Sequence, residues 1–134
     1  SPDAATLYHS DSIRRTVYQY AVEDDGTLGE KRVFAKVDTG GPDGLVVSAD
    51  GRVWVALAGG GHGVSVFNPD GSASHFIEIP QPMCTSVCFG GEDLRTLFIV
   101  SGSEGMGTDK AGAVYCTRTD VPGLMVPLAR VSLR

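Results

Sequence analysis

Residues 40–57 read GGPDGLVVSADGRVWVAL, and this stretch decides the fold. Apolar residues fill 45–47 and again 53–57, with Asp50-Gly51 between the two runs. An Asp-Gly pair between apolar runs predicts a β-hairpin, because the tight turn needs positive φ angles that glycine adopts at little cost. The stretch therefore predicts two antiparallel strands joined by a short turn.

The same pattern extends in both directions along the chain. Short apolar runs alternate with turn sequences, and no window keeps a helical stripe over three turns. The sequence therefore predicts an all-β chain. The expected strands are residues 6–8, 16–20, 45–48, 53–57, 64–67, 75–79, 86–89, 96–100, 112–117 and 128–133.

These expected strands recur at a fixed period. Tyr8, Trp54 and Phe98 occupy one register, 46 and 44 residues apart, and each follows a turn segment. Repeats of about 40–50 residues with four strands each are typical of β-propeller blades. A β-sandwich is the alternative, but it would not require the same internal order three times.

We therefore expect three blade-like units, at about 1–40, 41–82 and 83–134. The middle unit is almost whole, whereas the first lacks an innermost strand, which would lie just before Ser1. Closed propellers generally have four to eight blades, so the chain is expected to supply about three blades of a larger ring.

Composition excludes several classes of protein. The 134 residues are 42% hydrophobic and 20% charged, which excludes a disordered segment. The net charge is −5, and the only basic doublets, Arg14-Arg15 and Lys31-Arg32, are too few for a nucleic-acid surface. The longest apolar stretches are strand-sized, so no membrane span is expected, and no signal-peptide pattern opens the chain.

Three cysteines are present, without a CxxC motif. Cys84 and Cys88 are expected on the same side of a strand, because their spacing is even. A metal pair is conceivable, but no further cysteine or suitably spaced histidine completes a site. Reduced, mostly buried thiols are the preferred interpretation, and they favour the cytoplasm.

Four stretches together resemble the senescence-marker/gluconolactonase family, the regucalcin-like lactonases. Residues 40–56 are similar to its GGPDGLxVDxxGxxWVA motif, and residues 85–91 (TSVCFGG) to its TSxxFGG strand. Residues 1–11 resemble SPDGxxLYxxD, and residues 25–35 resemble DGxLxxRVFA. The resemblance covers the chain nearly from end to end, and it implies the C-terminal half of a six-bladed propeller.

The resemblance also implies a divalent metal, Ca²⁺, Mg²⁺ or Zn²⁺, on the propeller axis. The family's ligands are a Glu from an early blade, an Asn just upstream of the SPDG stretch, and the Asp of GPDG. Only the last has a counterpart here, Asp43, which is expected both to bind metal and to orient the attacking water. The Asn would lie before Ser1, so two of three protein ligands are absent.

The position of Asp43 agrees with that role. Asp43 stands immediately before an expected innermost strand, where the strands of a propeller converge on its axis. Thr85 takes the same register in the next unit, 42 residues on, so both residues are expected at the channel mouth. A hard cation needs such converging oxygens. Taken without its flanking motif, Pro-Asp-Gly is a turn tripeptide.

The sequence gives less support to the other candidate site residues. Asp11 follows the strand that carries Tyr8, and it either supports the channel or caps a turn. The three histidines, His9, His62 and His75, share no ligand spacing and are expected on surfaces or strands. The glycine-rich loop 59–63 is expected to connect two strands rather than to bind an anion, because no helix follows it. In the loop 102–109, Glu104 or Asp109 either touches substrate or lies on a mobile rim.

Two functions from different classes follow. In the first, the chain is part of a metal-dependent hydrolase of a small-molecule lactone or similar ester. In the second, it is an inactive structural or binding half-propeller that assembles as a homodimer or with a missing N-terminal half. The absent ligands favour the second interpretation for the chain standing alone, and metal titration distinguishes the two.

Overall fold

The computed structural model describes residues 1–103 and 112–126, and this part of the chain is all-β, as predicted. Its ten strands form three antiparallel sheets, and none of its segments is a helix that could cross a membrane. The strand expected at 128–133 and the candidate residues Glu104 and Asp109 lie outside the described residues.

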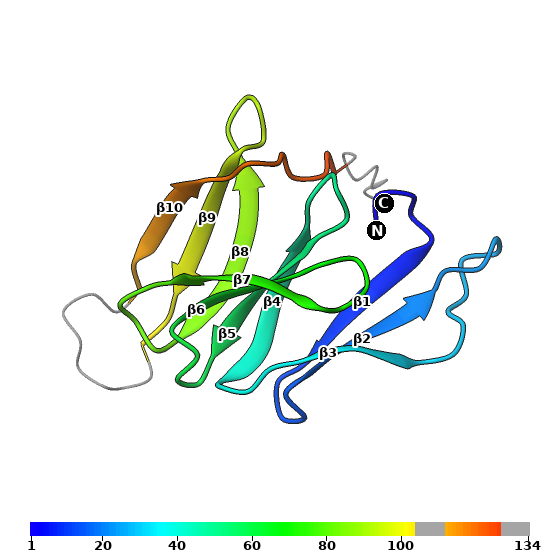
Figure 1. The fold of residues 1–134 in the computed structure, drawn as a ribbon, viewed down its shortest axis with the longest axis horizontal. Helices are drawn as coiled ribbons and strands as arrows, with labels where there is room; N and C mark the ends of the chain where they lie inside the picture. The colour runs from blue at the N-terminus through cyan, green and yellow to red at the C-terminus, as the bar shows by residue number, and fades with distance from the viewer. Residues whose placement is uncertain (104–111, 127–134) are drawn as a thin grey trace, which may run out of the picture.

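The three sheets follow one another along the chain and lie side by side, with the four-stranded sheet in the middle (Figure 1). Sheet 1 consists of β1 (Thr6–Asp11), β2 (Thr16–Ala21) and β3 (Arg32–Lys36). Sheet 2 consists of β4 (Gly41–Val47), β5 (Val53–Ala58), β6 (Gly63–Phe67) and β7 (Ala73–Glu78). Sheet 3 consists of β8 (Cys84–Gly90), β9 (Thr96–Ser101) and β10 (Val114–Arg118).

Residues 40–57 fold as the predicted hairpin. β4 and β5 pair antiparallel, and the turn between them places Gly51 at a φ of 84°. The Ser48 amide donates to the Arg52 carbonyl at 3.0 Å and closes the hairpin. The glycine-rich residues 59–62 connect β5 to β6, as expected.

Sheet 2 is covered on both faces. Since the side chains of a strand alternate between the two faces of its sheet, β5 contributes residues to both contacts. One face of β5, with Val53, Val55 and Leu57, packs against sheet 1. The opposite face, with Trp54 and Ala56, packs against sheet 3. The two cores therefore lie between consecutive sheets, the arrangement by which propeller blades pack.

One aromatic position recurs in this packing. Tyr8 on β1 packs edge-on against Phe34, with ring centroids 4.8 Å apart, and lies in the core shared with sheet 2. Trp54 on β5 lies in the core shared with sheet 3. Phe98 on β9 occupies the corresponding position of sheet 3 but is only half-buried, since the described part of the chain has no further sheet beyond it. All three sheets therefore use the same register.

The structure corrects the expectation for the cysteines. Cys84 is buried, whereas Cys88 and Cys116 are exposed, so the thiols are not mostly buried. Cys84 and Cys88 also lie on opposite faces of β8, because a β-bulge shifts the register between Cys84 and Ser86. The extra residue of a bulge reverses the alternation of side chains beyond it. All three cysteines are free.

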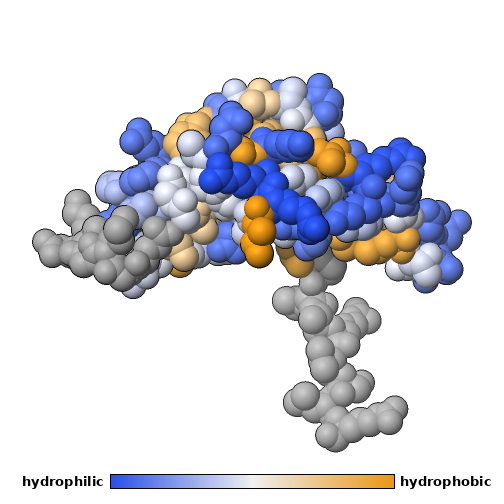
Figure 2. All heavy atoms as spheres, turned by 90° about the horizontal axis from the view of Figure 1, so that it is seen from below, coloured by the Kyte–Doolittle hydropathy of each residue, from blue (hydrophilic) through white to orange (hydrophobic). Residues whose placement is uncertain are grey.

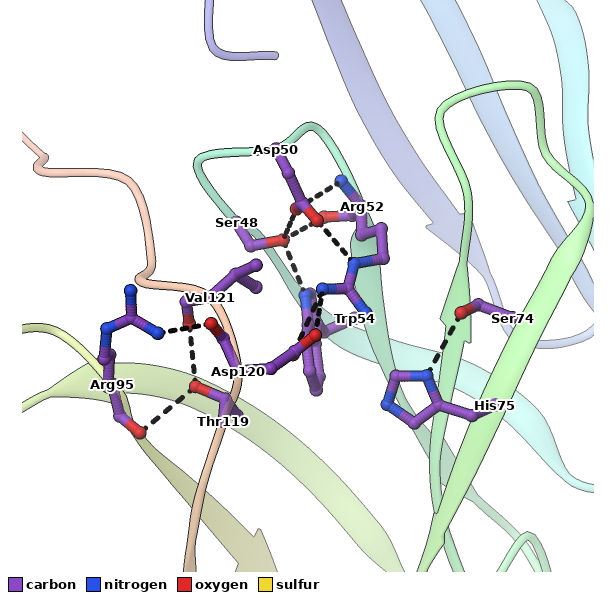
Figure 3. A network of polar contacts seen from close by, with 10 residues as sticks. All are labelled: Ser48, Asp50, Arg52, Trp54, Ser74, His75, Arg95, Thr119, Asp120 and Val121. Atoms are coloured by element: carbon purple, nitrogen blue, oxygen red, sulfur yellow. Dashed lines mark hydrogen bonds and ion pairs between the residues drawn. The ribbon is translucent and has the colours of Figure 1, made fainter.

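A polar network fastens the β4–β5 hairpin to the segment after β10 (Figure 3). The Trp54 indole donates to the Ser48 hydroxyl at 2.9 Å, and that hydroxyl donates to Asp50 at 2.6 Å. Arg52 pairs with Asp50 at 2.6 Å and with Asp120 at 3.0 Å. The side chain of Arg52 is only 13% exposed, so its two partners hold it between sheets 2 and 3.

This network predicts how stability depends on pH. Burial of Asp50 by itself would raise its pKa, but hydrogen bonds from Ser48 and Arg52 outweigh that effect and hold the pKa below the ordinary value of 3.8. The folded state therefore binds protons less readily than the unfolded state, so this contribution is present above about pH 4 and is lost as the pH falls further. Arg52→Met is expected to cost about 1 kcal/mol at pH 7, mostly through Asp50, because water screens the exposed Asp120.

Urea unfolding at pH 7 and pH 3.5 measures this dependence of stability on pH. The wild type is expected to lose more stability between the two pH values than Arg52→Met does. The exposed pair Arg32–Glu30 supplies a matched control, and Arg32→Met is expected to leave both melts unchanged. Equal pH dependence in wild type and Arg52→Met would show that the network does not stabilise the fold.

Candidate functional site

Asp43 lies on β4, in a bulge where the pairing with β5 shifts between Pro42 and Leu45. Its side chain is exposed, and within the described residues its carboxylate has no hydrogen bond and no ion pair. β4, which carries Asp43, packs beside β8, which carries Cys84. Burial raises the pKa of the Cys84 thiol to about 11; a hydrogen bond with the Leu57 backbone opposes this shift, and the charge of Asp43 adds to it. Asp43 is therefore an ionisable carboxylate directed away from the core, beside the neighbouring sheet.

Thr85 lies in the bulge of β8, between Cys84 and Ser86. The two bulges touch, because a Cβ on Gly44 would lie 2.6 Å from the Ser86 hydroxyl and 2.9 Å from the Thr85 carbonyl. Only glycine allows this approach of β4 to β8. The structure thus brings the strand positions of Asp43 and Thr85 together, while the Thr85 hydroxyl donates to Val100 at 3.3 Å.

Asp11 has a different environment at the end of β1. Its carboxylate accepts hydrogen bonds from the Arg14 amide at 3.0 Å and the Arg14 guanidinium at 3.1 Å. These bonds, the backbone one first, lower the pKa of Asp11. Its contacts are those of a residue that caps the β1–β2 turn, which is the alternative that the sequence left open.

A pocket of about 550 Å³ opens beside Asp43. The β1–β2 turn forms one wall, and the Ser12 hydroxyl attaches this turn to β4 by donating to the Pro42 carbonyl at 2.7 Å. This turn and the start of β4 lie at the lower end of the view in Figure 1, and Figure 2 shows the molecule from that side as largely hydrophilic with isolated hydrophobic groups. The lining residues are Ser12, Ile13, Arg15, Gly40, Gly41, Asp43, Ala58, Gly59 and Met83.

The described residues fit one ligand of a metal site and not a whole site. Residues 1–103 and 112–126 contain no group of three or more Asp, Glu, His or Cys side chains that could hold an ion. The histidines do not approach Asp43 as a group: His9 stacks on Tyr18, and His75 lies against Trp54. Asp43 is thus the acidic oxygen donor that this pocket offers to a hard cation.

Sequence reasoning did not identify Arg15 and Met83 as part of this pocket. Arg14 and Arg15 are adjacent in the sequence, and the doublet gives no signal that one arginine pairs with Asp11 while the other reaches the pocket. Met83 precedes β8 and carries no local signal either. Both reach the pocket only because consecutive sheets pack together.

Comparison with known proteins gives consistent matches. Residues 1–103 match the SMP-30/Gluconolactonase/LRE-like region. The chain is 39% identical to 6-deoxy-6-sulfogluconolactonase of Pseudomonas putida, over 96% of this chain and 47% of that protein. It is 31% identical to regucalcin of Xenopus laevis, over 86% of this chain and 42% of that protein. The chain thus spans about half the length of these relatives.

A solved structure also matches nearly the whole of this chain with about half of its own length. The crystal structure of a calcium-binding protein, regucalcin, from Agrobacterium tumefaciens superposes with a TM-score of 0.87 at 28% identity, over 98% of this chain and 48% of that chain. The matched region supports the propeller architecture expected from the repeat, and the three open sheets fit about half of such a ring.

Proposed function

The chain belongs to the SMP-30/gluconolactonase/LRE-like family, and from this premise we propose that it forms part of an enzyme that hydrolyses sugar lactones. The observation that carries the proposal is the exposed, unpaired carboxylate of Asp43 in a pocket between consecutive sheets, as found for the described residues. The relatives named as lactonases include one for a sulfonated gluconolactone and one for a pentonolactone, which supports a sugar lactone as the substrate class.

Lactone hydrolysis adds water to the carbonyl carbon and breaks the ring C–O bond, giving a hydroxy acid. A divalent metal, when bound, supplies polarisation of the carbonyl and a lowered pKa of water. Asp43 would hold this ion and orient the attacking water by accepting a hydrogen bond. The buried side chains behind Asp43, including Cys84, keep β4 and β8 in place.

Calcium is the first metal to test, because the crystallised regucalcin is described as calcium-binding. Ca²⁺ takes six to eight oxygen ligands, and a single carboxylate supplies at most two. The remaining ligands are expected from the other half of the ring, from backbone carbonyls and from water. Mg²⁺ and Zn²⁺ remain the alternatives.

The open faces of the outer sheets support the same proposal. Each outer sheet covers sheet 2 with one face and leaves apolar side chains on the other, with Val33 53% and Val114 65% exposed. We propose that the other half of a six-bladed ring covers both faces. The open face of sheet 1 carries Leu7, His9, Tyr18, Tyr20 and Val33, and that of sheet 3 carries Cys88, Phe98, Val100, Val114 and Cys116.

The isolated chain is therefore expected to self-associate, because soluble monomers rarely expose apolar patches of more than a few hundred Å². Light scattering at micromolar concentration measures this, and two copies that close a ring would give a dimer. A stable monomer of 14.0 kDa with a cooperative melt would contradict the expectation.

The same isolated chain is expected to have negligible lactonase activity and weak affinity for metal. The full-length product of its gene is expected to hydrolyse glucono-1,5-lactone in a pH-stat assay, and to lose that activity with a chelator. Calorimetry that finds micromolar Ca²⁺ binding by the isolated chain, abolished in Asp43→Ala, would show that this half holds the site by itself. Full-length protein that hydrolyses no lactone would refute the proposed function.

A further inference from the structure

Arg15 is the cationic residue among those that line the pocket beside Asp43. It is the last residue of the β1–β2 turn and adopts a φ of 50°, an uncommon conformation for a residue with a side chain. Its backbone is fixed on both sides: the amide donates to Ser12 at 3.3 Å, and the carbonyl accepts from Val37 at 3.0 Å. The structure therefore holds Arg15 at the pocket at some cost in backbone strain.

The guanidinium of Arg15 is positioned but not neutralised. Its Nη1 donates to the Asp38 carbonyl at 3.1 Å, and no carboxylate pairs with it among the described residues. The neighbouring Arg14, by contrast, forms an ion pair with Asp11 at 3.1 Å. Since a guanidinium has five N–H donors, one bond to a carbonyl leaves most of them for another acceptor.

The other residues of the lining offer an anion no cationic side chain and few side-chain hydrogen-bond donors. Ile13, Ala58 and Met83 are apolar, and the three lining glycines have no side chains. The hydroxyl of Ser12 already donates to Pro42. Asp43 would repel an anion placed beside it, so a negative group in this pocket has Arg15 as its cationic partner and must lie at that side.

We propose that Arg15 is a specificity-determining residue that binds an oxyanion substituent of the lactone, remote from the ring carbonyl. The inference rests on the proposed function, since it assumes that this pocket receives the lactone. Sulfonate, phosphate and carboxylate groups share the chemistry that a guanidinium recognises, because each presents two oxygens to its parallel N–H donors. The pocket volume of about 550 Å³ is ample for such a sugar acid lactone.

The test compares kcat/KM of the full-length product for glucono-1,5-lactone and for lactones that carry a 6-sulfonate, a 6-phosphate or a 6-carboxylate. Wild-type protein is expected to prefer at least one charged lactone. Arg15→Met is expected to lower kcat/KM for the preferred charged lactone by about 10- to 100-fold, which corresponds to the loss of one or two charge-assisted hydrogen bonds. The same substitution is expected to lower kcat/KM for the neutral lactone far less. Arg15→Lys is expected to restore part of the loss.

The matched control is Arg14→Met, which removes the adjacent arginine outside the pocket lining and is expected to leave the preference unchanged. Equal losses on neutral and charged lactones, or a wild type without preference for any charged lactone, would overturn the inference while leaving the proposed function intact. Wild-type protein inactive on every lactone would instead refute the proposed function.

A second measurement requires no turnover. In NMR spectra of the full-length product, methanesulfonate or inorganic phosphate is expected to shift the Arg15 side-chain Nε–H signal, with the shift saturating on titration. Arg14 serves as the internal reference, because its ion pair with Asp11 is expected to keep its signal in place. Equal shifts of both arginines would indicate nonspecific binding and overturn the inference.

Discussion

Replacing Trp54 with alanine is expected to lower the free energy of unfolding by about 3–5 kcal/mol, the usual cost of deleting a large buried aromatic side chain. Trp54 is 1% exposed and packs edge-on against Phe89 at 5.4 Å between ring centroids. Its indole also donates to the Ser48 hydroxyl, which the substitution would leave with one partner fewer in a buried place. Urea unfolding at a fixed protein concentration measures the loss.

Phe76→Ala is the matched control, since Phe76 is an aromatic residue of the same sheet but is 48% exposed on β7. It is expected to cost much less than Trp54→Ala. Trp54→Phe separates packing from the hydrogen bond, because it keeps most of the buried surface and removes the donor. Equal unfolding midpoints for Trp54→Ala and wild type would contradict the assignment of Trp54 to the core between sheets 2 and 3.

Asp43→Asn is expected to lower kcat/KM of the full-length product for its lactone by about 100-fold or more, since even groups that only support a metal ligand are worth 10–100-fold. Asparagine keeps the size of the side chain but not its charge, so the fold is expected to remain intact. The exposed position of Asp43 supports this, because no described residue depends on its carboxylate. Initial rates at saturating and limiting Ca²⁺ show whether metal affinity or turnover falls.

Asp38→Asn provides the control, because Asp38 is an exposed carboxylate close by in the sequence whose backbone carbonyl, not its side chain, contacts Arg15. Its activity is expected to equal that of wild type. If Asp43→Asn kept wild-type kcat/KM at limiting metal, Asp43 would be a turn residue and not part of the active site.

Much of the fold could be predicted because it is encoded locally. Asp50-Gly51 fixes one hairpin, and the recurrence of Tyr8 and Trp54 fixes how successive sheets face one another. β4 nevertheless begins at Gly41, four residues earlier than expected, and β3 was not among the expected strands. Its sequence, RVFAK, places three apolar residues in a row and not in alternation, and a bulge in its pairing with β2 buries the adjacent Phe34 and Ala35.

The bulges could not be predicted from local pattern. The bulges of β4 and β8 lie where Gly44 meets Ser86 across two sheets, a contact between residues far apart in sequence. The extra residue of the β8 bulge, which lies at this contact, reverses the side-chain alternation beyond it and explains the error for Cys84 and Cys88. Where two sheets approach so closely, even spacing no longer identifies the face of a strand.

Only the part of the site that lies in one continuous stretch of sequence could be predicted. Asp43 belongs to a continuous motif, so the sequence alone identified it as a candidate. Arg15 reaches the same pocket only because the β1–β2 turn is fastened to β4 by Ser12. A pocket wall built from two sheets has no signature in either segment taken separately.

The central claim, that this chain contributes Asp43 to the metal site of a lactonase, is tested most directly by locating the ion. Crystals of the full-length product soaked in Ca²⁺ would give an anomalous difference map at a wavelength where calcium scatters anomalously. The predicted result is one peak about 2.3–2.6 Å from a carboxylate oxygen of Asp43, with its remaining ligands from outside this chain segment. An ion bound elsewhere, with the Asp43 carboxylate in solvent, would contradict the claim.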